Sequence, residues 1–160
     1  MATSAEMVAE AKSRVQNLTV EETARELESG DVLLVDVREP SERSQAGAIP
    51  GAIETPRGML EFWADPTSAY HRDEFQPDRR VILHCASGGR SALAAAMLQD
   101  LGYANVAHMD GGINAWEGTG QARGGRKLTP DAAGIGLAAA DGTGLAAAVG
   151  YGWPREYRRF

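Results

Sequence analysis

Two short, almost continuously apolar runs constrain the fold of this chain more than any other feature of its sequence. Residues 32–37 are Val-Leu-Leu-Val-Asp-Val, and residues 81–84 are Val-Ile-Leu-His. A strand that is apolar at successive positions, rather than at alternate ones, has both faces buried, which is typical of a parallel sheet covered by helices. The two runs therefore predict central strands of an α/β domain.

Helical segments and further short strands alternate with these runs. Thr19, followed three residues later by Glu22, predicts a capping box. We therefore expect a helix over residues 20–29 that ends at Gly30 in the left-handed conformation. Further helices are expected at residues 40–44, 58–64, 91–101 and 113–117, and further strands after the turn at 47–53 and at 105–109. This alternation over residues 18–118 predicts a mostly parallel sheet with right-handed crossovers.

Three segments fall outside this pattern. Residues 1–17 are polar and alanine-rich, and we expect an N-terminal extension that forms a loose helix or a ragged start. Residues 65–79 are polar with two prolines and are expected to form a loop. Residues 119–160 are an alanine- and glycine-rich tail with six basic and three acidic side chains, against ten and nineteen in residues 1–118. The tail is either a disordered extension or a flexible segment that lies on the acidic domain.

Composition argues against several classes of function. The formal net charge of −6 argues against a nucleic acid partner. No run of about 18 apolar residues occurs, so no membrane span is expected. The N-terminus lacks the basic start and apolar core of a secretory signal, which predicts a cytoplasmic location. The three histidines have no ligand spacing and no nucleotide fingerprint lies between a strand and a helix, so we expect neither a metal nor a cofactor.

The segment that carries chemistry joins residues 81–84 to the helix that follows. The chain's only cysteine, Cys85, comes at the end of this strand, and Ala86, Ser87, Gly88, Gly89, Arg90 and Ser91 follow it. The glycines allow successive N–H groups to point inward, the helix start adds the positive end of its dipole, and Arg90 adds a full charge. All three stabilise an anion and so lower the pKa of a thiol, which predicts Cys85 as a nucleophile.

Other interpretations of these residues stay open from the chemistry alone. A lone cysteine can be a small buried apolar residue, and a strand-Gly-Gly-helix turn can be a plain connection. Arg90 can pair with an acidic surface residue instead of binding an anion. We expect His84 to pack beside the loop at the end of its strand rather than to act as a general base.

Three ordered motifs resemble those of the rhodanese family of sulfurtransferases. Residues 84–91 (His-Cys-Ala-Ser-Gly-Gly-Arg-Ser) resemble its active-site loop, Cys-x-x-Gly-x-Arg-Ser. Residues 36–42 and 47–53 are similar to its Asp-Val-Arg…Gly-His-Ile-Pro-Gly-Ala signature, and residues 109–116 to its closing Gly-Gly-x-x-Ala-Trp signature. The resemblance covers residues 18–118. It implies an α/β fold with a five-stranded, mainly parallel sheet flanked by helices on both faces.

The resemblance also implies a role for each matching residue. Cys85 would carry a sulfane sulfur, as a persulfide, from a small sulfur-anion donor such as thiosulfate to a thiol or protein acceptor. The backbone amides of residues 86–91 would surround that sulfur, and Arg90 would help to bind the donor and hold the loop. Asp36 and Arg38 would organise the site, with Arg38 in a structural salt bridge, which we expect to form with Glu42, rather than in contact with substrate.

Departures from the family pattern leave the donor open, and two other activities compete. Ala48 replaces the usual histidine, with little expected effect on chemistry, and the small Ala86 weakens the case for strong thiosulfate binding. The first alternative is a persulfide carrier that does not turn over small substrates. The second is a cysteine phosphatase or arsenate reductase. Those enzymes use a longer Cys-x5-Arg loop, whereas the spacing here is Cys-x4-Arg, and neither Asp65 nor Asp73 stands out as their acid catalyst.

Overall fold

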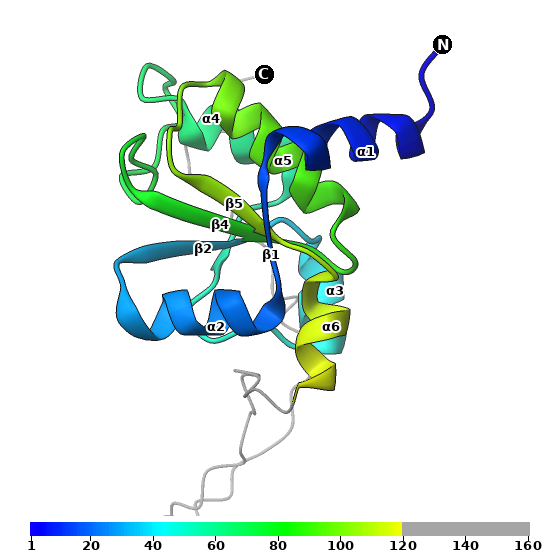
Figure 1. The fold of residues 1–160 in the computed structure, drawn as a ribbon. Helices are drawn as coiled ribbons and strands as arrows, with labels where there is room; N and C mark the ends of the chain where they lie inside the picture. The colour runs from blue at the N-terminus through cyan, green and yellow to red at the C-terminus, as the bar shows by residue number, and fades with distance from the viewer. Residues whose placement is uncertain (120–160) are drawn as a thin grey trace, which may run out of the picture. The chain divides into compact units, whose positions relative to one another are not determined.

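A five-stranded sheet lies at the centre of residues 1–119, the part of the chain that the computed structural model describes (Figure 1). Its strands are β1 (Gln16–Leu18), β2 (Val32–Asp36), β3 (Ile53–Glu54), β4 (Arg80–His84) and β5 (Val106–Met109). They lie in the order β1-β5-β4-β2-β3, and every neighbouring pair is parallel. The α/β fold with a parallel five-stranded sheet is therefore confirmed.

Helices cover both faces of this sheet, as predicted (Figure 1). On one face lie α1 (Ser4–Arg14), α4 (Leu60–Ala64) and α5 (Gly89–Asp100), and on the other lie α2 (Val20–Ser29) and α6 (Gly112–Gly118). The short α3 (Pro40–Ala46) and the 3-10 helix η1 (Arg57–Met59) belong to the connections. Residues 65–79 contain no helix or strand, as expected. The tail was predicted over residues 119–160, and all of it except Thr119 lies outside the described part.

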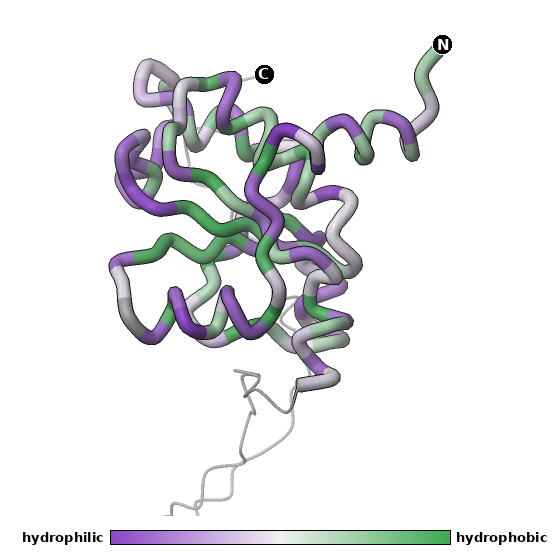
Figure 2. Tube along the Cα trace, in the orientation of Figure 1, coloured by the Kyte–Doolittle hydropathy of each residue, from purple (hydrophilic) through white to green (hydrophobic). Residues whose placement is uncertain are grey.

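The apolar runs lie in the central strands, which are largely green in Figure 2, and they supply both hydrophobic cores. In β2, Leu33 and Val35 pack toward α1, α4 and α5, while Leu34 packs toward α2 and α6. In β4, Leu83 and Ile82 divide between the two cores in the same way. Side chains alternate along a strand, so a strand between two layers of helices must be apolar at every position. The pattern of the sequence thus has a direct physical cause.

The N-terminal segment is more regular than the sequence suggested. Thr3 and Glu6 form a capping box, the Thr3 side chain accepting from the Glu6 amide and the Glu6 carboxylate accepting from the Thr3 amide. Ala11 and Val15 are buried in the core that α5 shares. The chain then enters β1, which pairs with β5 as an edge strand. Two of the three residues of β1 are exposed, so this strand has no apolar pattern by which it could be recognised.

The helix predicted over residues 20–29 is confirmed with its N-terminal cap, but its end differs. The amide of Thr19 donates to the Glu22 carboxylate at 2.8 Å, and the Glu22 amide donates back to the Thr19 hydroxyl at 3.1 Å. The prediction of a left-handed Gly30 is wrong, because its φ of −141° and ψ of 167° are extended. Only Asp31 separates Gly30 from β2, so the extended backbone takes the chain directly from the helix into the strand.

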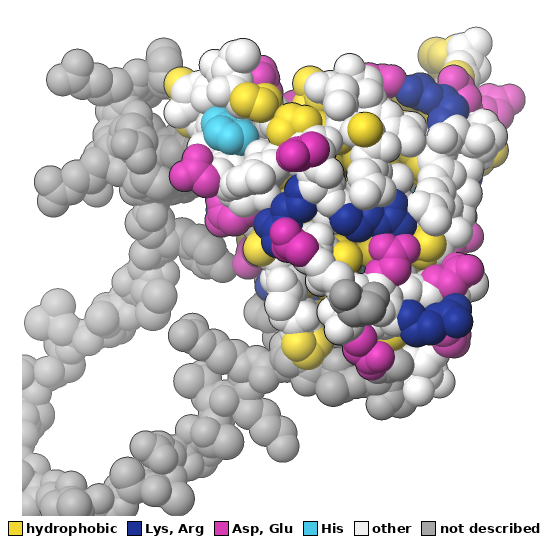
Figure 3. Space-filling model, turned by 60° about the vertical axis from the view of Figure 1, so that its left-hand side comes forward, with side chains coloured by type: hydrophobic (Ala, Val, Ile, Leu, Met, Phe, Trp, Pro, Cys, Tyr) yellow, Lys and Arg dark blue, Asp and Glu magenta, His cyan; other side chains and the backbone are white. Residues whose placement is uncertain are grey.

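Charges of opposite sign lie beside one another on the surface. On the face shown in Figure 3, acidic and basic side chains are neighbours rather than segregated. Several ion pairs join segments that are distant in the sequence; for example, Lys12 lies 2.6 Å from Asp110, and Arg80 lies 2.8 Å from Glu26. Within residues 1–119, no helix has the length and apolar character needed to cross a bilayer.

Candidate active site

Cys85 occupies the carboxyl edge of the sheet, immediately after the central strand β4. Strand β4 lies between β5 and β2, so the loop that begins at Cys85 lies at the middle of the sheet. The side chain points to the α5 side and is only 1% exposed. Ligands of parallel sheets bind at this edge, and Cys85 lies there as the sequence predicted.

The loop after Cys85 turns backbone amides toward the sulfur. The Gly88 N–H donates to Cys85 Sγ at 3.1 Å, and the Ser91 hydroxyl lies 3.6 Å from the same atom. Gly88 has a φ of +103°, and a Cβ there would lie 2.8 Å from the Asp110 carboxylate. A side chain at this position would therefore be both strained and crowded. The helix α5 begins at Gly89, so Arg90 and Ser91 lie in its first turn.

The start of α6 holds the outer side of the same loop. The Ile113 N–H donates to the Cys85 carbonyl at 2.8 Å, and the Asn114 N–H donates to the Ala86 carbonyl at 3.1 Å. Gly112 has a φ of +59°, and a Cβ there would lie 2.4 Å from the Cys85 carbonyl oxygen. These carbonyls therefore point to α6, which leaves the amides of the loop free to face the sulfur. The closing Gly-Gly motif of the sequence is thus part of the site.

The surroundings of Cys85 favour its anionic form. Burial by itself raises the pKa of the thiol, but the Ser91 hydroxyl and the backbone N–H groups of Ser91, Gly88 and Ser87 outweigh it. The pKa of Cys85 therefore lies below its usual value. Hydrogen bonds to a thiolate stabilise the charged form, and the thiolate is the nucleophilic form of cysteine.

Arg90 is held by a carboxylate. Its Nη1 and Nη2 atoms each lie 2.7 Å from an oxygen of Glu42, which forms a bidentate pair. This pairing lowers the pKa of Glu42 to about 2 and raises the pKa of Arg90. The negative charge of the Cys85 thiolate also contributes to the raised pKa of Arg90. The sequence left two roles open for Arg90, anion binding and pairing with an acidic residue. In the structure, Arg90 pairs with the acidic residue Glu42.

Arg38 forms a structural salt bridge, but its partner is not the one predicted. Its Nη2 donates to Asp36 Oδ2 at 2.7 Å and to the Gly47 carbonyl at 2.8 Å, and both ionic side chains are almost fully buried. Arg43 adds a second contact to Asp36 at 2.8 Å. The expected bridge to Glu42 is wrong, because that carboxylate is taken by Arg90. The short spacing from Asp36 to Arg38 lets the two side chains meet at the end of β2.

Beneath the loop lies His84, buried as expected at the end of β4. Its Nε2 is 3.6 Å from Asp36 Oδ2, and its Nδ1 is 3.4 Å from the Cys85 carbonyl. Burial lowers the pKa of His84. The ring therefore packs against the loop in its neutral form. Within residues 1–119, no group of three or more His, Cys, Asp or Glu side chains is arranged to hold a metal ion.

Two residues that sequence reasoning did not identify also reach the site. His108 on β5 lies 3.2 Å from the Ser91 hydroxyl through Nδ1, and 2.7 Å from Asn17 Oδ1 through Nε2. Asn17 lies on β1, which the sequence pattern did not predict, and His108 is an isolated polar residue in a buried strand. Only the pairing of β1 with β5 brings them together.

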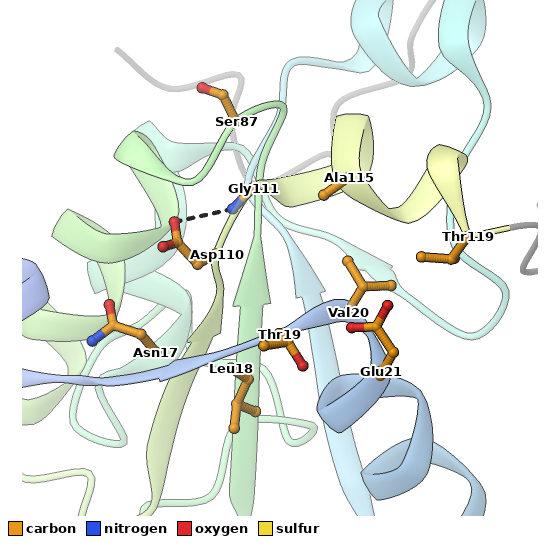
Figure 4. Close-up of a pocket in the computed structure, with 10 residues that line it drawn as sticks. All are labelled: Asn17, Leu18, Thr19, Val20, Glu21, Ser87, Asp110, Gly111, Ala115 and Thr119. Atoms are coloured by element: carbon orange, nitrogen blue, oxygen red, sulfur yellow. Dashed lines mark hydrogen bonds between the residues drawn. The ribbon is translucent and has the colours of Figure 1, made fainter.

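A surface pocket of about 510 Å³ lies beside the loop (Figure 4). Its walls come from the end of β1, the start of α2, the loop and the turn into α6, which contribute Asn17, Leu18, Thr19, Val20, Glu21, Ser87, Asp110, Gly111, Ala115 and Thr119. In Figure 4 the Asp110 carboxylate accepts a hydrogen bond from the Gly111 N–H, at 3.0 Å. Asn17 and Ser87 thus border a space large enough for part of a substrate.

Similarity to known proteins agrees with this geometry. The family model of the rhodanese-like domain matches residues 19–119. A sulfurtransferase of Allochromatium vinosum is 41% identical over 86 residues, which make up 54% of this chain and 72% of that protein. The thiosulfate sulfurtransferase GlpE of Pseudoalteromonas translucida is 32% identical over 102 residues, which make up 64% of this chain and 89% of that protein.

Solved structures extend the comparison. A protein of Rhodopseudomonas palustris, described as of unknown function and a possible tyrosine phosphatase, is 41% identical with a TM-score of 0.73, over 77% of this chain and 95% of that one. The human single-domain sulfurtransferase TSTD1 is 26% identical with a TM-score of 0.57, over 66% and 97%. The relatives named as sulfurtransferases support a sulfur-transfer role at the level of the family. The family model matches well over half of this chain, so the chain belongs to the rhodanese-like domain family.

Proposed function

We propose that this protein transfers a sulfane sulfur from a donor such as thiosulfate to a thiophilic acceptor, through a persulfide on Cys85. The observation that carries the proposal is the position of Cys85 Sγ, with the Gly88 N–H 3.1 Å away and a pKa lowered by the surrounding hydrogen bonds. Such a loop stabilises a thiolate and, after transfer, the charged outer sulfur of a persulfide.

Two displacements at sulfur make up the reaction. In the first, the Cys85 thiolate attacks the outer sulfur of thiosulfate; a new S–S bond forms, the old one breaks, and sulfite leaves with the electron pair. In the second, cyanide or the thiolate of an acceptor attacks the outer sulfur of the persulfide, and Cys85 leaves as the thiolate. No net proton or electron is left on the protein, so the cycle needs no cofactor.

Arg90 acts in this proposal chiefly by holding the loop. Its bidentate pair with Glu42 joins the first turn of α5 to α3, which fixes the helix end whose amides surround the sulfur. Its side chain is 39% exposed, so it can also contribute positive potential to an approaching anion. A small anionic donor fits this role, with a low-molecular-weight thiol or a protein as acceptor. Two further predictions come from the sequence alone. We expect no nucleic acid partner, and we expect a cytoplasmic location.

Phosphate-ester hydrolysis fits the site less well. Six residues from Cys85 to Arg90 give a loop one residue shorter than the phosphatase pattern, and the arginine that would bind phosphate oxygens is engaged with Glu42. Asp65, one of the two carboxylates considered as the acid that protonates a leaving oxygen, accepts hydrogen bonds from the Thr67 amide and hydroxyl, which lower its pKa and favour its charged form. We therefore favour sulfur over phosphorus as the atom attacked at Cys85.

The test is the intact mass of the reduced protein after mixing with thiosulfate, beside the variant Cys85→Ser. We expect the wild-type mass to rise by one sulfur atom, and the mass of the variant to stay the same. The chain has a single cysteine, so the added sulfur has only one site. A wild type that gains no sulfur from any sulfane-sulfur donor, but hydrolyses a phosphate ester in a Cys85-dependent way, would overturn the proposal.

A persulfide carrier is distinguished by the second half of the reaction. If Cys85 takes up sulfur from a protein donor but transfers it to cyanide only slowly, the protein is a carrier with a specific acceptor. A transfer to cyanide that keeps pace with loading indicates a turnover enzyme. The loaded protein, separated from donor, should therefore be mixed with cyanide and thiocyanate formation followed in time.

A further inference from the structure

The imidazole of His108 is held in one tautomer by Asn17. The Asn17 side-chain amide donates to the carbonyls of Lys12 and Val15, at 2.8 Å and 3.0 Å, which turns its Oδ1 toward the ring. Because an amide oxygen only accepts, Nε2 of His108 at 2.7 Å must carry the hydrogen. In the neutral ring, Nδ1 is then without a proton and can only accept a hydrogen bond.

The Ser91 hydroxyl has one proton and three acceptors within reach. These are the Gly88 carbonyl at 3.2 Å, His108 Nδ1 at 3.2 Å and Cys85 Sγ at 3.6 Å. The Gly88 carbonyl already accepts from the Ala92 amide at 3.1 Å. Within residues 1–119, His108 Nδ1 has no hydrogen-bond partner other than the Ser91 hydroxyl. A buried acceptor without a donor is unfavourable. While Cys85 is a thiol, the Ser91 hydroxyl therefore donates its hydrogen bond to His108 Nδ1.

We propose that Asn17 and His108 are positioning residues that turn the Ser91 hydroxyl away from Cys85 and thereby limit the fraction of thiolate. In the thiol state, Ser91 donates to His108 and its oxygen accepts the S–H of Cys85. In the thiolate state, the hydroxyl must rotate to donate to sulfur, which leaves His108 Nδ1 unpaired in a buried site. His108 therefore opposes the loop amides, which favour the thiolate.

The charges around His108 keep it in the accepting form. Burial is the largest influence and lowers the pKa of His108 to about 4, while Asp110 acts in the opposite direction and Lys12 in the same one. The last two lie 2.6 Å apart as an ion pair, so their effects partly cancel. Over the range in which a cysteine titrates, the ring is neutral and Nδ1 has no hydrogen. The direction of the Ser91 hydroxyl thus depends on the tautomer, and not on protonation of the ring.

The test is the rate at which iodoacetamide alkylates Cys85 as a function of pH, which reports the thiolate of the only cysteine in the full chain. In His108→Leu, the hydroxyl can turn to the sulfur without leaving a buried imidazole nitrogen unpaired, because its other acceptor, the Gly88 carbonyl, still accepts from the Ala92 amide. We expect the apparent pKa of the thiol to fall by about half a unit to one unit, which is about 3- to 10-fold more thiolate at pH values below it. Met109→Leu is the matched control, because this neighbour on β5 packs in the opposite core and should leave the profile unchanged.

A double-mutant cycle shows whether His108 acts through Ser91. In a Ser91→Ala background, His108→Leu should leave the alkylation profile where Ser91→Ala alone puts it. An equal shift with and without the hydroxyl would overturn the proposal, and so would an unchanged or raised thiol pKa in the single variant His108→Leu.

A second variant and a spectroscopic measurement keep the test independent of how well His108→Leu folds. Asn17→Ala, at an exposed position on β1, removes the acceptor that fixes hydrogen on His108 Nε2, so that the other tautomer, with hydrogen on Nδ1, can form and donate to Ser91. We expect the thiol pKa to fall in this variant too, by less than in His108→Leu. In the wild type, ¹⁵N chemical shifts should show His108 with hydrogen on Nε2. Hydrogen on Nδ1 instead would refute the mechanism.

This inference rests on the proposed role of Cys85 as the sulfur carrier, but the two can fail separately. Alkylation and the imidazole tautomer involve no sulfur donor, so they test the hydrogen-bond chain alone. Loading with thiosulfate tests the proposed function alone. A protein that shows the predicted alkylation profiles and takes up no sulfur would retain the hydrogen-bond chain and lose the sulfurtransferase.

Discussion

Replacing Gly112 with alanine tests whether α6 holds the loop of Cys85 in shape. The new Cβ would lie 2.4 Å from the Cys85 carbonyl oxygen and 2.6 Å from the Ala86 carbonyl oxygen. Both neighbours are backbone, so they cannot move aside like the end of a flexible side chain. The φ of +59° adds a conformational cost to any residue with a Cβ. The variant should therefore push the start of α6 away from the loop.

The magnitude follows from two separate costs. A positive φ costs a residue with a Cβ about 1–2 kcal/mol relative to glycine. Overpacking in a close-packed region costs about 1–3 kcal/mol more. We expect Gly112→Ala to lower the free energy of unfolding by about 2–5 kcal/mol, which is a large share of the stability of an ordinary domain.

A second glycine separates the two costs. Gly102 has a φ of +95°, but a Cβ there would meet nothing within 4 Å. Gly102→Ala should therefore show only the conformational cost, and the difference between the variants is the crowding at the loop. Urea unfolding with linear extrapolation measures both values. If Gly112→Ala is no more destabilising than Gly102→Ala, the contact of α6 with the loop does not constrain the site as described.

Two further predictions concern ion pairs. Arg38→Gln leaves the buried Asp36 carboxylate with only part of its positive charge, and urea unfolding should show a loss of about 3 kcal/mol in the free energy of unfolding. The control Arg57→Gln removes a surface pair with a glutamate and should cost about 0.5 kcal/mol or less. Glu42→Gln removes the partner of Arg90; since the folded pKa of Glu42 is lowered to about 2, its stabilisation is present above the ordinary pKa of glutamate and disappears as pH falls through about 2.

The pH dependence of the free energy of unfolding provides the control for Glu42→Gln. Glu42 is partly exposed, so its pair contributes only about 0.2–1 kcal/mol. The difference in unfolding free energy between wild type and Glu42→Gln should be constant above about pH 5 and close to zero near pH 2. A difference that grows as pH falls would contradict a lowered carboxyl pKa.

Much of the candidate site could be predicted from local order along the chain. Cys85 through Ser91 are consecutive, so a strand end, two glycines and a helix start must lie together whatever the rest of the chain does. The pairing partners could not be predicted in this way. Arg38 and Arg90 each had several acidic side chains within reach, and the choice of Asp36 for one and Glu42 for the other depends on how β2, α3 and α5 approach one another.

By itself, the sequence determined the α/β class, the central strands and the loop of Cys85, because burial on two faces and capping leave local signatures in residue order. Tertiary structure alone decided the edge strand β1, the extended Gly30 and the chain from Asn17 through His108 to Ser91. A three-residue edge strand buries too little to impose a pattern. A hydrogen bond between residues 91 positions apart exists only after the sheet has brought β1 beside β5.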